Sequence, residues 1–190
     1  MTTPPEMLQD PQEFEAFLEI VRELDVRSYL EVGAKYGGTF YRVGMALPEG
    51  SKCVAVDLPR GTRAWTASEK SLCAVAMELS TANRPTTLLW GDSTDPKIIR
   101  QVRELGPFDL ILIDANHTMP FVRRDFANYG PMATKAVAFH DISWKRAPAW
   151  VGVRIDVPQF WDEIKSSYHH RELRYDTSGK NNGIGVIFTQ

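Results

Sequence analysis

The sequence predicts one α/β domain with a doubly wound, mostly parallel sheet of seven strands, helices on both faces and an antiparallel C-terminal hairpin. Three observations support this fold class. A chain of 190 residues, 43% of them hydrophobic, is long enough for one sizeable core. From Arg27 onward, short apolar runs alternate with helical periodicity, which is typical of a parallel sheet covered on both faces. The last two apolar runs flank the polar turn DTSGKNNG, which indicates a hairpin at the sheet edge.

The first elements follow from caps and apolar runs. Residues 1–9 are expected to be a disordered tail of the single domain 1–190, and Asp10-Pro11 is typical of the start of an N-terminal helix over 10–26. The next predicted elements are a strand over 27–32, a helix from the following glycines to Pro48-Glu49-Gly50, a strand over 52–56 and a helix over 64–79.

The remaining elements are apolar runs bounded by turn residues. They are strands over 86–90, 108–113, 135–139, 172–175 and 184–188, and helices over 95–105, 121–129 and 157–168. Ser93 or Thr94 can cap the helix over 95–105, and Gly106-Pro107 ends it. A loop over 142–155 carries Trp144 and Trp150.

Composition argues against several classes of protein. The formal net charge of -2 gives no general attraction to nucleic acid or to an anionic membrane, so we expect neither as a partner. The N-terminus lacks the pattern of a signal peptide, and no apolar run has the length of a membrane span. Cys53 and Cys73 are predicted to be buried reduced thiols, which favours a cytoplasmic location.

Polar residues directly follow most strands of the predicted parallel sheet. They are Glu31 and Gly33, Asp57, Asp92 and Ser93, Asp114 and Asn116, and His140 and Asp141. The carboxyl ends of parallel strands meet at one edge, where such sheets bind ligands. We therefore expect these side chains to surround one crevice.

The turn in YLEVGAKYGG indicates what this crevice binds. Gly33 and Gly37 would let the backbone approach a ligand, Glu31 could accept hydrogen bonds from an amine, and Asp57 could bind both hydroxyls of a ribose. The pattern lacks the G-x-G-x-x-G of a dinucleotide site, and an acid before the glycines would repel a pyrophosphate. A nucleoside that carries a cation, such as S-adenosylmethionine, fits better. The alternative is a tight strand–helix turn without a ligand.

With this turn and the motifs that follow it, the sequence resembles the class I S-adenosylmethionine-dependent methyltransferases. YLEVGAKYGG, VAVDLP, LLWGDS and FDLILIDANHTMPFVRRDF resemble their four ordered motifs. IDANHTMPFVRRDFANYGPM followed by AFHDI is similar to the small-molecule O-methyltransferase branch with an Asp-Gly-Asp-His type motif, which includes proteins similar to cephalosporin hydroxylases and macrocin methyltransferases. The resemblance extends over residues 27–190 and implies a Rossmann-like fold and S-adenosylmethionine as cofactor.

The resemblance also implies roles for individual residues. Glu31, Gly33 and Gly37 would line the methionine end, Asp57 would bind the ribose, Leu58, Asp92 and Ser93 would border the adenine, and Asp114 would lie beside the sulfonium. Two departures stand out. Ala115 and Asn116 replace a usual glycine and a common acid, and MATKAVAFHD replaces the usual Lys-Pro-Gly-Gly before the fifth strand.

Methyl transfer to a hydroxyl also requires loss of the hydroxyl proton. Asp114 and Asp141 could hold Mg²⁺, which would lower the pKa of the acceptor, although the neighbours of Asp141 are His140 and Ile142 rather than a third oxygen donor. His117 and His140 are the alternative bases. The structural alternatives are a helix cap for His117 and a loop hydrogen bond for His140.

The sequence leaves the acceptor open. The flat faces of Trp144 and Trp150 suit a small-molecule acceptor, but they could equally be core or a contact in a homo-oligomer. Two other functions remain open: a cofactor-binding protein without transferase activity, in a regulatory or assembly role, and a nicotinamide-dependent oxidoreductase, which the missing third glycine and Glu31 disfavour.

Overall fold

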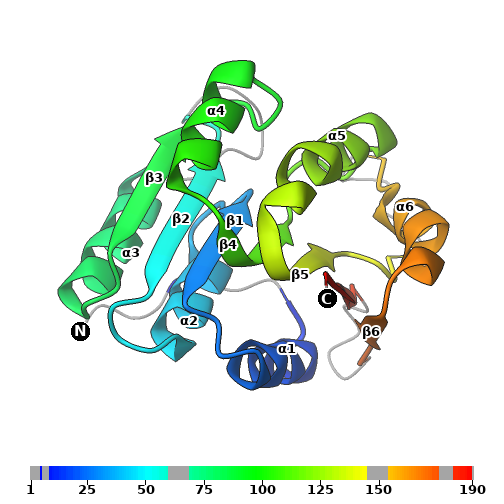
Figure 1. The fold of residues 1–190 in the computed structure, drawn as a ribbon, viewed down its shortest axis with the longest axis horizontal. Coiled ribbons are helices and arrows are strands. Elements are labelled where there is room, and N and C mark those ends of the chain that lie inside the picture. Colours follow the sequence, from blue (N-terminus) through cyan, green and yellow to red (C-terminus); the bar gives the residue numbers. More distant parts are fainter. Residues whose placement is uncertain (1–4, 6–8, 60–68, 145–153, 176–181, 190) are drawn as a thin grey trace.

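A seven-stranded sheet runs through the molecule in the order β3-β2-β1-β4-β5-β7-β6 (Figure 1). The computed structural model describes residues 5, 9–59, 69–144, 154–175 and 182–189. The strands are β1 (Ser28–Val32), β2 (Lys52–Asp57), β3 (Thr86–Trp90), β4 (Phe108–Ile113), β5 (Ala133–His140), β6 (His170–Leu173) and β7 (Ile184–Phe188). The first five pair in parallel, whereas β7 lies between β5 and β6 and is antiparallel to both. The predicted fold class is therefore confirmed.

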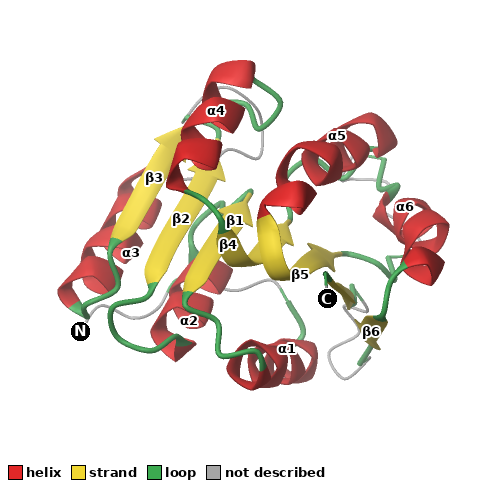
Figure 2. Cartoon of the chain, viewed as in Figure 1, coloured by secondary structure: helices red, strands yellow, loops and turns green. Residues whose placement is uncertain are grey.

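Helices cover both faces of the sheet (Figures 1 and 2). They are α1 (Pro11–Glu23), α2 (Gly38–Ala46), α3 (Glu69–Thr81), α4 (Pro96–Leu105), α5 (Met119–Tyr129) and α6 (Val157–Ile164). One core joins α1, α2 and α3 to the sheet and includes Phe17, Phe40 and Leu72. A second core joins α4, α5 and α6 to the other face and includes Val102 and Phe160. No helix in the described part of the chain has the length and apolar character needed to cross a bilayer.

Several predicted boundaries are corrected by local hydrogen bonds. Asp10 caps α1 as predicted, but the helix ends at Glu23. The cap of α4 is Asp95, whose carboxylate accepts from the amide of Lys97, so the prediction of Ser93 or Thr94 was wrong. Thr94 instead donates its amide and hydroxyl to Asp92. Beyond Ile164 the chain continues as a 3₁₀ turn over Lys165–Ser167 rather than as α-helix.

The predictions for the N-terminal tail and for the two cysteines also differ from the structure. Gln9, expected in a disordered tail, is buried, and the carbonyl of Pro5 accepts a hydrogen bond from Arg42; the other tail residues lie outside the described residues. Cys53 is buried as predicted, but Cys73 is exposed. The reason is helical spacing: Leu72, Val75 and Leu79 form the inward stripe of α3, which turns position 73 toward solvent.

The topology places the candidate site at the carboxyl ends of β1 and β4. The helices that follow β1 and β2 pack on one face, and those that follow β3 and β4 pack on the other, so the sheet reverses between β1 and β4 (Figure 1). Ladder hydrogen bonds continue past the strand ends, from the Gly33 amide to Val56 and from the Asp114 amide to Val32. The residues after these strands are thereby held side by side.

Candidate functional site

The glycine turn after β1 is shaped by its neighbours. Gly33 has φ +94°, and a Cβ there would lie 2.5 Å from the carbonyl oxygen of Asp114 and from the Cα of Ala115. Gly37 has φ +84° and precedes α2, and a Cβ there would lie 3.0 Å from the side chains of Leu72 and Val75. Backbone and side-chain packing therefore require both glycines, whether or not a ligand also approaches them.

Asp57 at the end of β2 closes this turn. Its carboxylate accepts hydrogen bonds from the backbone amides of Lys35 and, at 2.6 Å, of Leu58. Burial raises the pKa of Asp57, and these backbone hydrogen bonds oppose that effect. A carboxylate offers about four lone-pair positions, so Asp57 keeps capacity to accept from a ligand.

Glu31 lies buried at the end of β1, with 1% of its surface exposed. The hydroxyl of Tyr29 donates to its Oε2 over 2.6 Å. Burial raises the pKa of Glu31 well above its ordinary value, and the charges of Asp114 and Asp57 raise it further. A cationic group beside Glu31 would offset this repulsion, because an opposite charge favours the ionised carboxylate.

Four predicted residues meet where β4 and β5 end. The Nε2 of His117 lies 3.1 Å from Asp114 Oδ1 and 3.5 Å from Asp141 Oδ2. The Nδ1 of His140 lies 3.2 Å from Asp114 Oδ1 and 3.2 Å from Asp141 Oδ1. We call these four residues the Asp–His cluster. The predicted neighbourhood of Asp114 and Asp141 is thus observed, and both histidines belong to it.

Opposite charges set the protonation of the cluster. Burial alone would lower the pKa of His140, but the charges of Asp141 and Asp114 outweigh burial and raise this pKa to about 10. The pKa of His117 is raised in the same way, chiefly by its hydrogen bond to Asp114. Against the effect of burial, the charge of His140 and the histidine hydrogen bonds hold the pKa of Asp114 far below its ordinary value, whereas burial raises the pKa of Asp141.

Loops beyond the strand ends position the cluster. Asp141 has a left-handed backbone with φ 67°, and the residues after it donate to the segment before β7, Ile142 to Gly183 and Ser143 to Asn182. Such a conformation in a non-glycine residue is often found at functional sites. The His117 loop is held by Asp156, which donates its amide to the His117 carbonyl and accepts from the Met119 amide.

Asp92 and Ser93, predicted to border an adenine, lie at the end of β3. Both make hydrogen bonds to residues outside the Asp–His cluster. Asp92 accepts from Thr94, and the carbonyl of Ser93 accepts from the hydroxyl of Tyr129 over 2.6 Å. Next to them is Asp125, a fully buried residue of α5 that the sequence analysis missed. Its signal was an acid on the same helix face as the buried Val122 and Tyr129.

The cluster contains a group of metal donors. The ligand atoms of Asp114, His140 and Asp141 lie within 4.8 Å of one another, and His117 is not part of this group. Among the described residues, Asp141 Oδ1 is buried and makes no hydrogen bond, although it forms an ion pair with His140 Nδ1 over 3.2 Å. The donors therefore fit a divalent cation, but the imidazole nitrogen does not fit the all-oxygen shell that Mg²⁺ takes.

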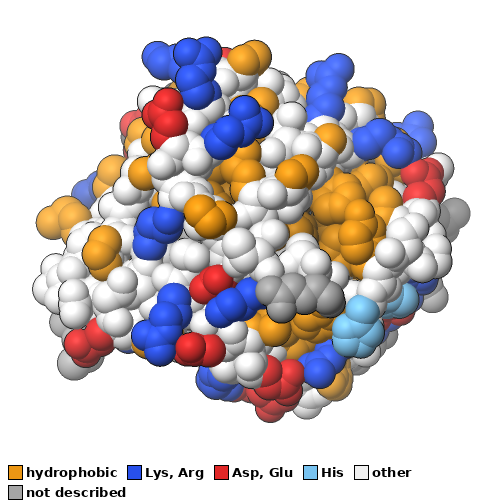
Figure 3. All heavy atoms as spheres, viewed as in Figure 1, with side chains coloured by type: hydrophobic (Ala, Val, Ile, Leu, Met, Phe, Trp, Pro, Cys, Tyr) orange, Lys and Arg blue, Asp and Glu red, His pale blue; other side chains and the backbone are white. Residues whose placement is uncertain are grey.

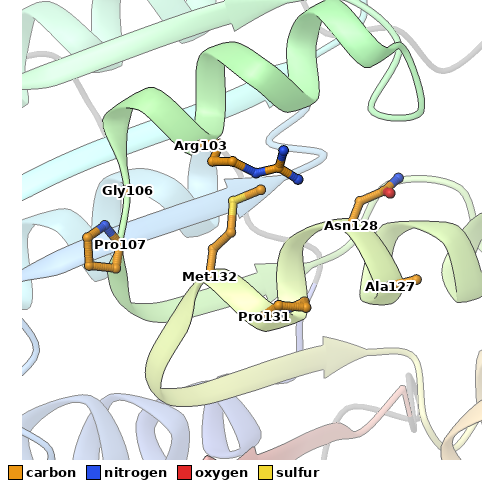
Figure 4. Close-up of a pocket in the computed structure, with 7 residues that line it drawn as sticks. All are labelled: Arg103, Gly106, Pro107, Ala127, Asn128, Pro131 and Met132. Carbon is orange, nitrogen blue, oxygen red and sulfur yellow. The ribbon is translucent and has the colours of Figure 1, made fainter.

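A separate hollow lies between α4 and α5, at the opposite end of β4 (Figure 4). It has a volume of about 320 Å³, and Arg103, Pro107, Asn128 and Met132 are among the residues that line it. None of the predicted site residues lines this hollow. On the face shown in Figure 3, Lys and Arg side chains are interspersed with acidic and apolar ones, and apolar side chains are exposed between α5 and α6.

Comparison with known proteins identifies the fold and the family. A family model described as a methyltransferase domain matches residues 30–142. The O-methyltransferase TomG from Streptomyces achromogenes, solved with SAM, is 16% identical with a TM-score of 0.72, over 98% of this chain and 83% of that one. An O-methyltransferase from Bacillus cereus, solved with SAH, is 16% identical with a TM-score of 0.68, over 98% and 84%. No curated protein sequence matches the chain.

Proposed function

The chain belongs to the methyltransferase-domain family, and on that basis we propose that it transfers the methyl group of S-adenosylmethionine to a hydroxyl of a small molecule. The observation that carries this proposal is the meeting of Glu31, Asp57 and the Asp–His cluster around the glycine turn. This arrangement supports the proposal, because Glu31 and Asp57 would accept hydrogen bonds from an amine and a ribose beside the imidazoles and carboxylates of the cluster. The O-methyltransferase folds of the two solved neighbours, one with SAM and one with SAH, support the same assignment.

The cofactor would extend from the end of β1 to the end of β3. Glu31 would accept from its amine, and Asp57 would use its remaining lone pairs for the ribose hydroxyls. Gly33 and Gly37 would border the methionine end, and Leu58, Asp92 and Ser93 the adenine. Asp114 would lie beside the sulfonium, where a negative charge is favourable.

Methyl transfer is an in-line displacement in which the acceptor oxygen bonds to the methyl carbon as the carbon–sulfur bond breaks. S-adenosylhomocysteine leaves, and the hydroxyl proton passes to a base. We assign that role to His117 rather than His140, because the side chain of His117 is 24% exposed and that of His140 only 6%. Asp114 would orient the imidazole of His117 through the 3.1 Å contact.

Asp114, His140 and Asp141 would hold a divalent ion, which would lower the pKa of an acceptor hydroxyl bound to it. The acceptor is proposed to be a small molecule. The loop over 142–155, whose tryptophans were predicted to suit the acceptor, falls mainly in residues 145–153, including Trp150, which lie outside the described residues. A cytoplasmic location and a homo-oligomer remain proposals from the sequence.

Calorimetric titration with S-adenosylhomocysteine, with NAD in a parallel run, tests the proposed cofactor. We expect binding of the first alone. Asp57→Ala should weaken it by about 10- to 100-fold, because a hydrogen bond to a charged group is worth about 1.5–3 kcal/mol.

Asp95→Ala is the matched control, since it removes an aspartate whose carboxylate caps α4 by accepting from the amide of Lys97. It should cost stability and leave the affinity unchanged. Unaltered binding in Asp57→Ala would contradict the ribose assignment, and binding of NAD alone would contradict the proposed cofactor.

A further inference from the structure

A buried tyrosine of β1 lies in the core next to Glu31. Tyr29 has no exposed surface, and its ring stacks on Phe40 of α2 with 6.0 Å between the ring centroids. Successive side chains of a strand point to opposite faces, so Tyr29 and Glu31, two residues apart, lie on the same face of the sheet. The sequence analysis missed Tyr29, because an aromatic side chain is ordinary in a buried strand.

The neighbouring strands fix the position of this ring. Tyr29 pairs with Cys53 of β2 and with Leu110 of β4, and both of these residues are buried in the same core as Phe40. Side chains in a close-packed core sit in single rotamers, so the hydroxyl of Tyr29 is held in one place. From there it donates to Oε2 of Glu31 over 2.6 Å.

Glu31 has more acceptor capacity than Tyr29 uses. A carboxylate offers about four lone-pair positions, whereas a tyrosine hydroxyl donates one proton. Burial raises the pKa of Glu31, and the hydrogen bond from Tyr29 opposes that effect, while the charges of Asp114 and Asp57 add to it. Tyr29 thus favours the ionised carboxylate and leaves it lone pairs for a cationic group.

From this packing we infer that Tyr29 is a positioning residue, which orients Glu31 to accept from the amine of the cofactor. Because Tyr29 is fully buried, it would act through the carboxylate of Glu31 and not by touching the ligand. The inference deepens the proposed function and rests on it for the identity of the ligand. If Tyr29 served only the core, it would affect every ligand of this site equally.

The test compares S-adenosylhomocysteine with its deamino analogue, which keeps the adenine, ribose, sulfur and carboxylate. Calorimetric titration measures both affinities. In the wild-type protein we expect the amine to strengthen binding by about 10- to 100-fold, because a hydrogen bond between charged groups is stronger than one between neutral groups. Tyr29→Phe removes only the hydroxyl. It should reduce this preference for the amine by about tenfold and leave the affinity for the analogue nearly unchanged.

Tyr129→Phe is the matched control. It removes the hydroxyl of another buried tyrosine, which donates over an equal 2.6 Å to the carbonyl of Ser93. The preference for the amine should stay at the wild-type value, whatever happens to the two separate affinities. Glu31→Gln should lose the preference, and adding Tyr29→Phe to it should change the preference no further, because the tyrosine acts through the carboxylate. Thermal unfolding checks that each variant is folded.

The outcomes separate this inference from the proposed function. An unchanged preference in folded Tyr29→Phe, or an equal loss of affinity for both ligands, would overturn the inference. Equal affinity of the wild-type protein for the two ligands would also overturn it and leave the proposed cofactor standing. No binding of S-adenosylhomocysteine to the wild-type protein would contradict the proposed function, and the inference would fall with it.

Discussion

At the scale of single residues, the surroundings of Gly33 leave no room for a side chain. Its φ is +94°, and a Cβ would lie 2.5 Å from the backbone of Asp114. This backbone is tied to β1 by the hydrogen bond from the Asp114 amide to the Val32 carbonyl, so it cannot move aside as a flexible side chain can. The segment after β4, which carries Asp114 and His117, therefore packs directly on the glycine turn.

We predict that Gly33→Ala lowers the free energy of unfolding by about 2–5 kcal/mol, as the sum of a left-handed alanine and an overpacked contact. Urea denaturation measures this loss. Gly50→Ala is the matched control, because Gly50 also has positive φ, at +81°, but its Cβ would meet nothing within 4 Å. It should lose only about 1–2 kcal/mol. Equal losses in the two variants would contradict the steric argument.

A second prediction at this scale concerns Asp125. Burial raises its pKa from 3.8 to about 7. Between these values the folded state keeps a proton that the unfolded state has lost, so stability falls as pH rises from about 4 to 7. This contribution reaches at most about 4 kcal/mol, at about 1.4 kcal/mol for each unit of pKa shift.

Asp125→Asn cannot ionise and should lack this contribution to the pH dependence. We expect the difference in free energy of unfolding between the variant and the wild type to move in favour of the variant as the pH rises from 4 to 8. Urea titrations at several pH values measure it. A difference that stays constant with pH would show that Asp125 ionises freely in the folded protein.

At the scale of elements, apolar runs bounded by turn residues were sufficient to predict β3, β4 and β7, whose observed bounds match the expected ones. The sequence pattern was less informative where a side chain chooses among nearby amides. Asp92, Ser93, Thr94 and Asp95 could all cap α4, and only the geometry shows that Asp92 binds Thr94 and leaves the cap to Asp95.

The candidate site, like the helix and strand bounds, could be predicted from the sequence only in part. Since parallel strands end at one edge, the meeting of Glu31, Asp57 and Asp114 followed from the order of strands. The sequence could not show that His117 and His140 both reach Asp114, because loop backbones beyond the strand ends decide that. Nor could it show that Asp156, far along the chain, holds the loop of His117.

Asp156 gives the prediction at this scale. Because its carboxylate accepts from the Met119 amide at the start of α5, Asp156→Ala should loosen the loop that carries His117. We expect faster amide hydrogen exchange in peptides that cover residues 115–120, and no change in β1. Asp156→Asn retains an oxygen acceptor and should exchange like the wild type. Slow exchange in the alanine variant would mean that other contacts hold the loop.

At the scale of the whole molecule, the N-terminal helix fastens the C-terminal strands. Glu13 in α1 is fully buried, and its Oε1 accepts from the amide of Tyr175 over 3.0 Å and its Oε2 from the amide of Gly183 over 3.1 Å. These amides border β6 and β7, and the residues beside Gly183 in turn hold the end of β5 through Ile142 and Ser143. The chain ends are thus joined behind the Asp–His cluster.

We predict that Glu13→Leu lowers the free energy of unfolding by about 1–4 kcal/mol, because it leaves the buried amide of Gly183 without an acceptor at about 1–3 kcal/mol and removes the part-buried hydrogen bond to the amide of Tyr175. Glu13→Gln keeps an acceptor oxygen and should lose less. Glu23→Leu is the control on the same helix. It removes an exposed ion pair with Arg171 and should cost at most about 1 kcal/mol. Urea denaturation measures both losses. Similar losses for Glu13→Leu and Glu23→Leu would contradict this account, because the contacts of Glu13 would then stabilise the protein no more than an exposed ion pair does.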